Sequence, residues 1–430
     1  MNVKSDNRQS LGYIARILPA ALVAGLVGSG TVAIFDAALG IFQHAALTIP
    51  APPFLLPVAG AFLAGTFILR FFPCAGGEGV PLYLVAVNRD EGRLRFTDTL
   101  LKFPATILAL GTFGSGGIVG PLMRICSGFT SSLSRPLRIV PQNGSLRTPA
   151  ICGTAAAVGA IFHAPLGGGI LAAEVLRREN LRYRDLFPAI LASTVGVISS
   201  EHLLGREAIF SIDAPSAPTT VALIAWLLVV ALFSGGVGML FIDLFEHMAK
   251  LFSRIRFGQP ARALIGSLGI ALIYLLLGRE PLGISMGLYR GLASGDLDPS
   301  ILRGPAIGNL ALLLALLIAV KIVATSFTVG SGMSGGFTGP LVILGFASGA
   351  LMSAVAGVTP GEPAYYLFLA CGLPAILGAV MNVPIAAAVL TIELFGTNYA
   401  LPAAVGGIVS FLLFKTRSVY GRGLQLGEPD

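Results

Sequence analysis

Charge is the scarcest property of this 430-residue chain: Asp, Glu, Lys and Arg make up only 11% of its residues, while hydrophobic residues make up 55%. A soluble globular domain carries about 25% charged residues, so this composition excludes an ordinary soluble protein. The chain instead consists of successive low-charge apolar stretches, long enough to cross about 30 Å of hydrocarbon. We therefore expect an all-α polytopic membrane protein surrounded by the lipid bilayer, with no separate soluble domain.

Cysteine and histidine are also sparse, with four residues of each. The cysteines lack C-x-x-C spacing and the histidines are dispersed, so neither predicts a metal site or a disulfide framework. There is no H-E-x-x-H motif, and no convincing base accompanies a serine nucleophile. We therefore expect the protein not to be an enzyme and to use no cofactor and no metal.

The basic residues are concentrated in loops, for example Arg89, Arg93 and Arg95 or Lys250 and Arg254. Loop arginines and lysines mark the cytoplasmic face of a membrane protein. The net charge of +7 therefore follows from the topology of a multi-pass protein in the cell (inner) membrane. We expect no nucleic-acid partner.

Glycine and proline are abundant, with 55 and 27 residues, and many lie inside the apolar stretches. Such residues break helices at membrane depth, and the breaks are where many transporters bind their ions. The N-terminal end of a broken helix carries unpaired N–H groups and partial positive charge, which favours anions.

An internal repeat divides the chain. Residues 102–122, KFPATILALGTFGSGGIVGPL, match residues 321–341, KIVATSFTVGSGMSGGFTGPL, at ten of 21 positions without a gap, at an offset of 219. The same offset pairs a cysteine, a proline and a glutamate of each half: Cys152 with Cys371, Pro165 with Pro384, and Glu174 with Glu393. We expect two halves, 1–215 and 216–430, with the same fold in opposite membrane orientations, related by a two-fold axis in the membrane plane.

Each half contains one glycine-rich break, Gly117-Ile118-Val119-Gly120-Pro121 or Gly336-Phe337-Thr338-Gly339-Pro340. We expect both to begin a helix with proline in the first turn, and their backbone amides to face each other across a pore. The first motif along the chain, Gly77-Glu78-Gly79-Val80-Pro81, places a carboxylate between glycines, and the breaks at Gly117 and Gly336 are the second and third motifs. Acidic residues at membrane depth generally serve a function.

These three motifs resemble the filter motifs of the CLC family of chloride channels and proton-coupled chloride transporters, G-S-G-I-P, G-[RK]-E-G-P and G-x-F-x-P. Tyr420, in TRSVYGRGL, matches the tyrosine that follows them. The resemblance extends over roughly residues 10 to 425. It implies a CLC-like inverted repeat with about 18 tilted and broken helices per subunit. It also implies a homodimer with two separate pores and a small inorganic anion, chloride by default, as the transported ion.

Two carboxylates typical of the family's transporters are absent. Val119 stands where the gating glutamate of the second motif falls, and an alternative alignment that starts at Gly114 loses that glutamate as well. Val175 stands where transporters carry a proton on an inner glutamate, while its neighbour Glu174 matches a structural acid that caps or pairs near a helix end. Both absences argue against the usual exchange of protons for chloride.

Two further positions bear on the ion. Thr338 replaces an aromatic residue whose backbone amide helps to hold the central anion, and both a neutral effect and a change of selectivity remain open. Tyr420 matches a tyrosine whose hydroxyl faces that anion, and we favour this position over one in an interfacial aromatic belt.

Glu78 stands where the family's serine donates a hydroxyl to the ion. An ionised carboxylate about 4 Å from an anion repels it by about 4 kcal/mol at an effective dielectric near 20. Three solutions remain open: burial keeps the acid neutral so that it donates, the carboxylate occupies the anion site and swings away, or it attracts cations. The structural alternative is a helix-end charge that faces cytoplasmic water.

The sequence thus favours an anion (chloride-type) channel or uncoupled carrier, with Glu78 and Val119 as its two gate positions. A proton-linked anion transporter that uses Glu78 as its titrating gate is the first alternative. A cation pathway in the same frame and a binding protein without transport are the others.

Overall fold

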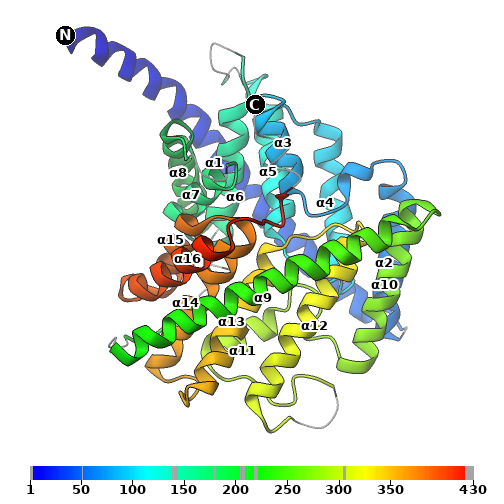
Figure 1. Ribbon diagram of the computed structural model, residues 1–430. Helices are drawn as coiled ribbons and strands as arrows, with labels where there is room; N and C mark the ends of the chain where they lie inside the picture. The colour runs from blue at the N-terminus through cyan, green and yellow to red at the C-terminus, as the bar shows by residue number, and fades with distance from the viewer. Residues whose placement is uncertain are drawn as a thin grey trace.

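The computed structural model describes residues 3–50, 52–137, 139, 144–177, 181–203, 205, 209, 210, 212, 214–216, 221–303 and 307–421. All regular structure in this part of the chain is helical, as the sequence predicts (Figure 1). The first half contributes α1 (Val3–Thr48), α2 (Leu56–Ala64), α3 (Val80–Asn88), α4 (Phe96–Gly111), α5 (Val119–Ser134), α6 (Arg147–Phe162), α7 (Pro165–Glu174) and α8 (Tyr183–Ile198).

The second half contributes α9 (Val221–Ser253), α10 (Gly258–Leu277), α11 (Met286–Ser294), α12 (Leu310–Gly330), α13 (Thr338–Val355), α14 (Pro363–Met381), α15 (Pro384–Phe395) and α16 (Ala400–Phe414). Five short 3-10 or π segments complete the described structure: η1 (Pro53–Leu55), η2 (Gly65–Leu69), η3 (Pro73–Ala75), η4 (Ser199–Leu203) and η5 (Thr397–Tyr399). The sixteen α-helices of the described residues compare with about 18 helices expected.

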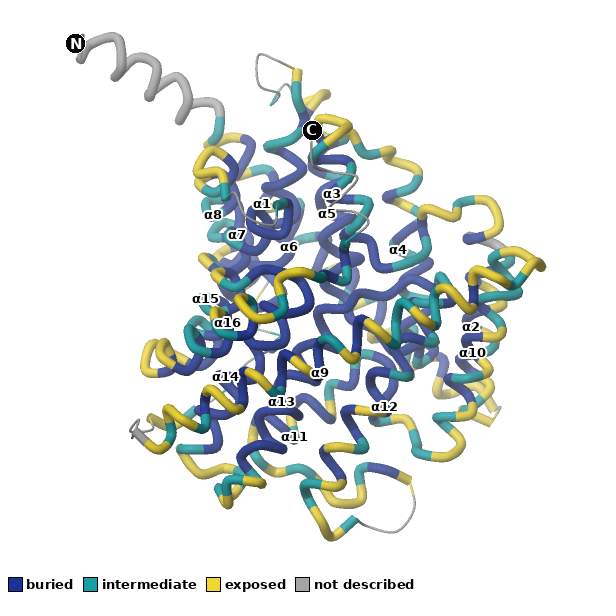
Figure 2. The backbone as a smooth tube through the Cα atoms, in the orientation of Figure 1, coloured by how far each residue is buried: buried dark blue, intermediate teal, exposed yellow. Residues whose placement is uncertain are grey.

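Length and hydropathy divide the helices into an interior and a periphery. Eight of the described helices are long and apolar enough to cross a membrane. Nearly all of α13 and α14 is buried, whereas only 28% of α10 is buried (Figure 2). A helix that is apolar on all sides belongs in such an interior, while the exposed apolar side chains of the periphery suit contact with lipid.

The two halves make the same contacts with their roles exchanged. The hydroxyl of Thr106 lies 2.7 Å from that of Ser334, and the hydroxyl of Ser115 lies 3.1 Å from that of Thr325. Because Thr106 corresponds to Thr325 and Ser115 to Ser334 in the repeat, this is one contact made twice. An approximate two-fold axis between the halves produces this reciprocity.

Glu174 and Glu393 cap helices of the opposite half. Glu174, at the end of α7, accepts hydrogen bonds from the first amides of α15, with Oε2 2.7 Å from Ala386 N. Glu393 accepts the equivalent bonds at the start of α7, with Oε2 2.7 Å from Gly167 N. Carboxylates are favourable at helix N-termini because the first amides lack intrahelical partners. This geometry agrees with the structural role expected for Glu174.

The short helices α3 and α11 are a further equivalent pair that the constant offset does not reveal. Each follows a residue with positive φ, Gly79 at +108° and Ser285 at +53°. A buried lysine lies beneath each helix start: Lys102 donates to Gly77 O at 2.7 Å, and Lys321 donates to Gly283 O at 3.2 Å. The connection from α11 to α12 is longer than that from α3 to α4, which shifts the numbering between the two pairs.

Candidate functional site

The three glycine-rich motifs and Tyr420 come together at one point in the protein interior. Each motif lies at a helix start: Val119 begins α5, Thr338 begins α13 and Val80 begins α3. The proline of every motif lies within the first turn, where its missing N–H costs no hydrogen bond. The two helix starts expected at Val119 and Thr338 are therefore present, and the motif around Glu78 begins a helix as well.

The second and third motifs touch each other directly. Gly117 N donates to Gly336 O at 2.7 Å, and Gly336 N donates to Gly117 O at the same distance. The two segments run antiparallel at this isolated bridge, as expected for repeat partners related by a two-fold axis. This pairing differs from the expectation of amides that face an open pore, because these two amides have their hydrogen bonds satisfied by the protein itself.

The Glu78 carboxylate accepts hydrogen bonds from amides and a hydroxyl that were expected to bind an anion. Its Oε2 accepts a hydrogen bond from Val80 N at 2.6 Å, and its Oε1 accepts one from the Tyr420 hydroxyl at 3.1 Å. Phe337 N lies 3.5 Å from Oε1, at the outer limit of a hydrogen bond. Glu78 is only 5% exposed and Tyr420 only 1%, so this carboxylate does not face open water.

Two glycines make room for the carboxylate. A Cβ on Gly120 would collide with Oε1 of Glu78, so α5 can approach the acid only with glycine there. Gly79 has φ of +108°, a conformation that L-residues with a side chain rarely adopt, and it turns the chain into α3. The glycines around Glu78 thus serve both close approach and the local backbone turn.

Lys102 forms hydrogen bonds with the backbone of the segment that carries Glu78. Its ammonium donates to Gly76 O at 3.0 Å and to Gly77 O at 2.7 Å, and the side chain is buried. These bonds fix the carbonyls of the turn that carries Glu78, and the lysine places a positive charge near the carboxylate. The sequence offers one signal for this residue, the identity of Lys102 and Lys321 in the repeat.

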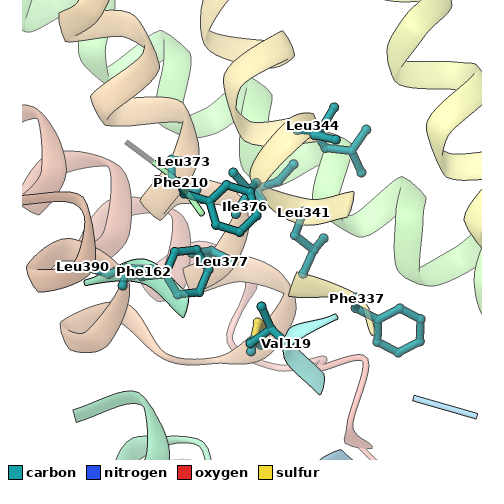
Figure 3. Close-up of a cluster of buried hydrophobic side chains, with 14 of the residues drawn as sticks. Val119, Phe162, Phe210, Phe337, Leu341, Leu344, Leu373, Ile376, Leu377 and Leu390 are labelled. Atoms are coloured by element: carbon teal, nitrogen blue, oxygen red, sulfur yellow. The ribbon is translucent and has the colours of Figure 1, made fainter. Parts of the chain in front are cut away.

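Val119 and Thr338, which are repeat partners, lie fully buried at the starts of α5 and α13. Val119 is surrounded by apolar side chains that include Phe337 and Leu341 (Figure 3). The hydroxyl of Thr338 is buried and has no hydrogen-bond partner among the described residues. A buried hydroxyl without a partner is costly, so this oxygen is available to a bound ion or water.

A cavity of about 310 Å³ leads to the site. It is lined by Pro81, Tyr420 and residues of α9, among them Glu246 and Lys250. The lining combines a carboxylate and an ammonium 3.8 Å apart, so the entrance is polar and close to neutral. Tyr420 thus lines this cavity and also donates a hydrogen bond to the Glu78 carboxylate.

The segment that carries Tyr420 is anchored on two sides. Arg417 forms ion pairs with Asp243 and Glu246 of α9, and Val419 N donates to Val380 O at 2.9 Å. The hydrogen bond that Arg417 donates to Asp243 raises the pKa of the guanidinium above its usual value. These contacts hold the tyrosine hydroxyl within reach of Glu78.

Other candidate chemistry is not assembled in the described residues. They contain no group of three or more His, Cys, Asp or Glu side chains that could hold a metal ion. All four cysteines are free. Val175, which is predicted to stand at the inner glutamate position, is buried.

Comparison with known sequences shows relatives along most of the chain. An uncharacterised protein of Methanocaldococcus jannaschii is 30% identical over 85% of this chain and 86% of its own length. A chloride/fluoride channel protein of Pseudomonas syringae is 25% identical over 95% of this chain and 86% of its own length. An H(+)/Cl(-) exchange transporter of Vibrio vulnificus is 25% identical over 86% of this chain and 78% of its own length.

Solved structures share the fold. A CLC-type fluoride/proton antiporter superposes with a TM-score of 0.79 at 21% identity, covering 95% of this chain and 97% of the other. A slow cyanobacterial Cl-/H+ antiporter gives 0.78 at 20% identity with the same coverage. Residues 60–415 match the family model described as voltage gated chloride channel. This protein is therefore a multi-pass membrane protein of the voltage gated chloride channel (CLC) family, a family of chloride channels and proton/chloride exchangers.

Proposed function

We propose that this chain carries a small inorganic anion, chloride first, through the site around Glu78, and that the carboxylate of Glu78 is the gate. The observation that carries the proposal is the ring of donors on this carboxylate: Val80 N, Phe337 N and the Tyr420 hydroxyl. Such donors would equally hold a halide. The ionised side chain thus acts as a tethered anion that competes with the transported one.

The repulsion between ionised Glu78 and a bound anion sets the strength of this competition. Two negative charges about 4 Å apart repel by about 4 kcal/mol at an effective dielectric near 20, equivalent to roughly a thousandfold loss of affinity. The site therefore holds either ionised Glu78 or a free anion. Protonation removes the charge and lets the side chain leave its donors, so that an anion can take its place.

The family's other titrating positions are apolar here, at Val119 and Val175. Glu78 is thus the only carboxylate of the three filter motifs, which supports a channel or uncoupled carrier in preference to a two-glutamate exchanger. The cavity that reaches Tyr420 supports one alternative, a proton-linked transporter in which Glu78 takes its proton from that side. A cation pathway is disfavoured because N–H and O–H donors and the ammonium of Lys102 surround the site.

Anion flux against pH, measured with purified protein in liposomes, tests the proposal. Flux through the wild type should fall as pH rises, because deprotonation of Glu78 restores the competing anion. Glu78→Gln keeps the shape without the charge and should give flux that is nearly independent of pH. Glu362→Gln, a charge removal at an exposed position, is the matched control and should follow the wild type.

Two outcomes would contradict the proposal. Unchanged pH profiles in Glu78→Gln would reduce Glu78 to a structural charge at a helix end. Cation flux that disappears in Glu78→Gln would support the cation pathway instead. A proton flux that accompanies anion flux in a fixed ratio in the wild type would identify the proton-linked transporter.

We further propose that the chain works as a homodimer in the cell (inner) membrane, with halves 1–215 and 216–430 inverted across the bilayer. The resemblance to the CLC family, which implies a homodimer, supports the dimer. So do the repeat partners Leu166 and Ile385, at the starts of α7 and α15, because each leaves about half of an apolar side chain uncovered in the single subunit. Leu166→Trp with Ile385→Trp should convert the detergent-solubilised dimer to monomer in light scattering, and an unchanged mass would contradict this interface.

A further inference from the structure

Two hollows of different chemistry adjoin at one end of the α4–α5 helix pair, away from Glu78. The first, about 830 Å³, lies where the connection from α3 to α4 packs against the end of α5. Its charged lining comprises four arginines and two acids, Arg89, Arg93, Arg95, Arg135, Asp90 and Glu91. The hollow therefore carries a net positive charge.

Most of this positive charge is uncompensated. Within the described residues, Arg89, Arg95 and Arg135 form no ion pair. Arg93 lies 3.8 Å from Glu91, and both side chains are more than 60% exposed, so solvent screens this pair. Guanidinium groups hold phosphate oxygens through two parallel hydrogen bonds, which makes a phosphate group the matching ligand.

The second hollow, about 340 Å³, is apolar and lies where α1, α4 and α5 meet. Its lining consists of Thr31, Ile34, Leu100, Leu101, Phe103, Pro104 and Phe129. The hydroxyl of Thr31 donates to Val27 O at 2.6 Å, so it presents no free polar group. Ile34 and Leu100 are 65% and 49% exposed, which opens this groove to the hydrocarbon of the membrane.

The two hollows follow each other along the same helices. Arg95 caps α4 in the first and Leu100 lines the second, about 7.5 Å further along the helix. On α5, Ser132 lines the first hollow and Phe129, about one turn away, lines the second. The rings of Phe96 and Phe129 are 5.9 Å apart and lie along this seam.

We propose that these adjoining hollows bind one anionic phospholipid, with its phosphate among the arginines and an acyl chain in the groove of α1, α4 and α5. The charge of the first hollow selects an anionic headgroup, as basic clusters at a membrane surface do. The apolar groove distinguishes a lipid from a free phosphate compound, which would leave that groove empty.

The full-length protein in detergent tests this by native mass spectrometry after incubation with phosphatidylglycerol, phosphatidylcholine or glycerol 3-phosphate. The wild type should retain phosphatidylglycerol and neither of the others. Arg95→Gln with Arg135→Gln, and separately Leu100→Trp, should each weaken retention by at least about tenfold. Arg254→Gln with Arg256→Gln, a matched loss of two exposed arginines elsewhere, should leave it unchanged.

Equal losses in the control pair and in Arg95→Gln with Arg135→Gln would show attraction by general surface charge and overturn the proposal. Full retention in Leu100→Trp would overturn it as well. Glycerol 3-phosphate that binds the wild type as well as the lipid does would reveal a headgroup site alone. This last comparison needs no variant, so the proposal stays testable even where a substitution prevents folding.

Discussion

The starts of α3 and α11 share two features in the two halves, but only one of them carries an acid. Both have a positive-φ residue before the helix and a buried lysine beneath it, Lys102 or Lys321. Glu78 precedes the turn in the first half, whereas Ile284 stands at the equivalent place in the second. Features shared by both halves serve the fold, and the feature confined to one half is the candidate for function.

Serine at these two equivalent positions should give the largest difference. Glu78→Ser replaces a competing charge by a hydroxyl donor, so chloride should bind up to roughly a thousandfold more tightly. Ile284→Ser should leave chloride affinity nearly unchanged. Isothermal titration calorimetry of both variants measures the contrast, and equal affinities would remove the functional distinction between the halves.

Replacement of the two lysines distinguishes a structural role, which both share, from an electrostatic effect on Glu78, which only Lys102 has. Lys102→Met and Lys321→Met each leave buried carbonyls without a donor, so each should lower the free energy of unfolding by about 1–3 kcal/mol. Only Lys102→Met should also move the decline of anion flux to higher pH, because Glu78 loses a positive charge that favours its ionised form. Thermal unfolding and liposome flux measure the two effects, and a pH shift in Lys321→Met as well would contradict the assignment.

Val119→Glu tests whether a carboxylate at the start of α5 adds a second gate. The new side chain is an acid close to the helix start that already accommodates Glu78, so it should introduce a pH-dependent block of about tenfold, about 1.4 kcal/mol. Val119→Gln is the neutral control and should lack the pH dependence. Flux in Val119→Glu that equals the wild type at every pH would show that the second motif is aligned wrongly.

Thr338→Val should have the smallest effect. This change keeps the shape but removes a buried hydroxyl that has no partner among the described residues, so stability should change by less than about 1 kcal/mol. If the hydroxyl contacts the transported ion, chloride affinity should fall by up to about fivefold. An unchanged affinity and an unchanged nitrate-to-chloride ratio would favour a neutral substitution.

The sequence predicts the helical class, the repeat and the helix starts of α5 and α13, because each depends on local composition or on identity at a constant offset. The equivalence of α3 and α11 is not found in this way, since the longer connection after α11 shifts the numbering. Three identities at another offset, Gly77 with Gly283, Leu82 with Leu288 and Tyr83 with Tyr289, are too few to detect unaided.

The partners of the site residues were also beyond sequence reasoning. Tyr420 donates a hydrogen bond to Glu78, a contact that the sequence does not predict, and the expected contact of its hydroxyl with the transported anion stays a prediction. The mutual pairing of Gly117 and Gly336, however, depends on two loops more than 200 residues apart in sequence, which no local pattern encodes. The sequence also leaves open whether Glu78 is a neutral donor, occupies the anion site or attracts cations. That choice depends on which donors surround the carboxylate in space.

The exchange of helix caps between Glu174 and Glu393 has a consequence for how such a chain is put together. A residue of one half contacts a residue of the other, and the equivalent pair makes the same contact in reverse, which is the rule of an isologous dimer interface. At these caps the two parts of the single polypeptide meet as the two subunits of an isologous dimer do. Neither piece of a chain severed at the midpoint would be complete, because each would lack a carboxylate that only the other can supply.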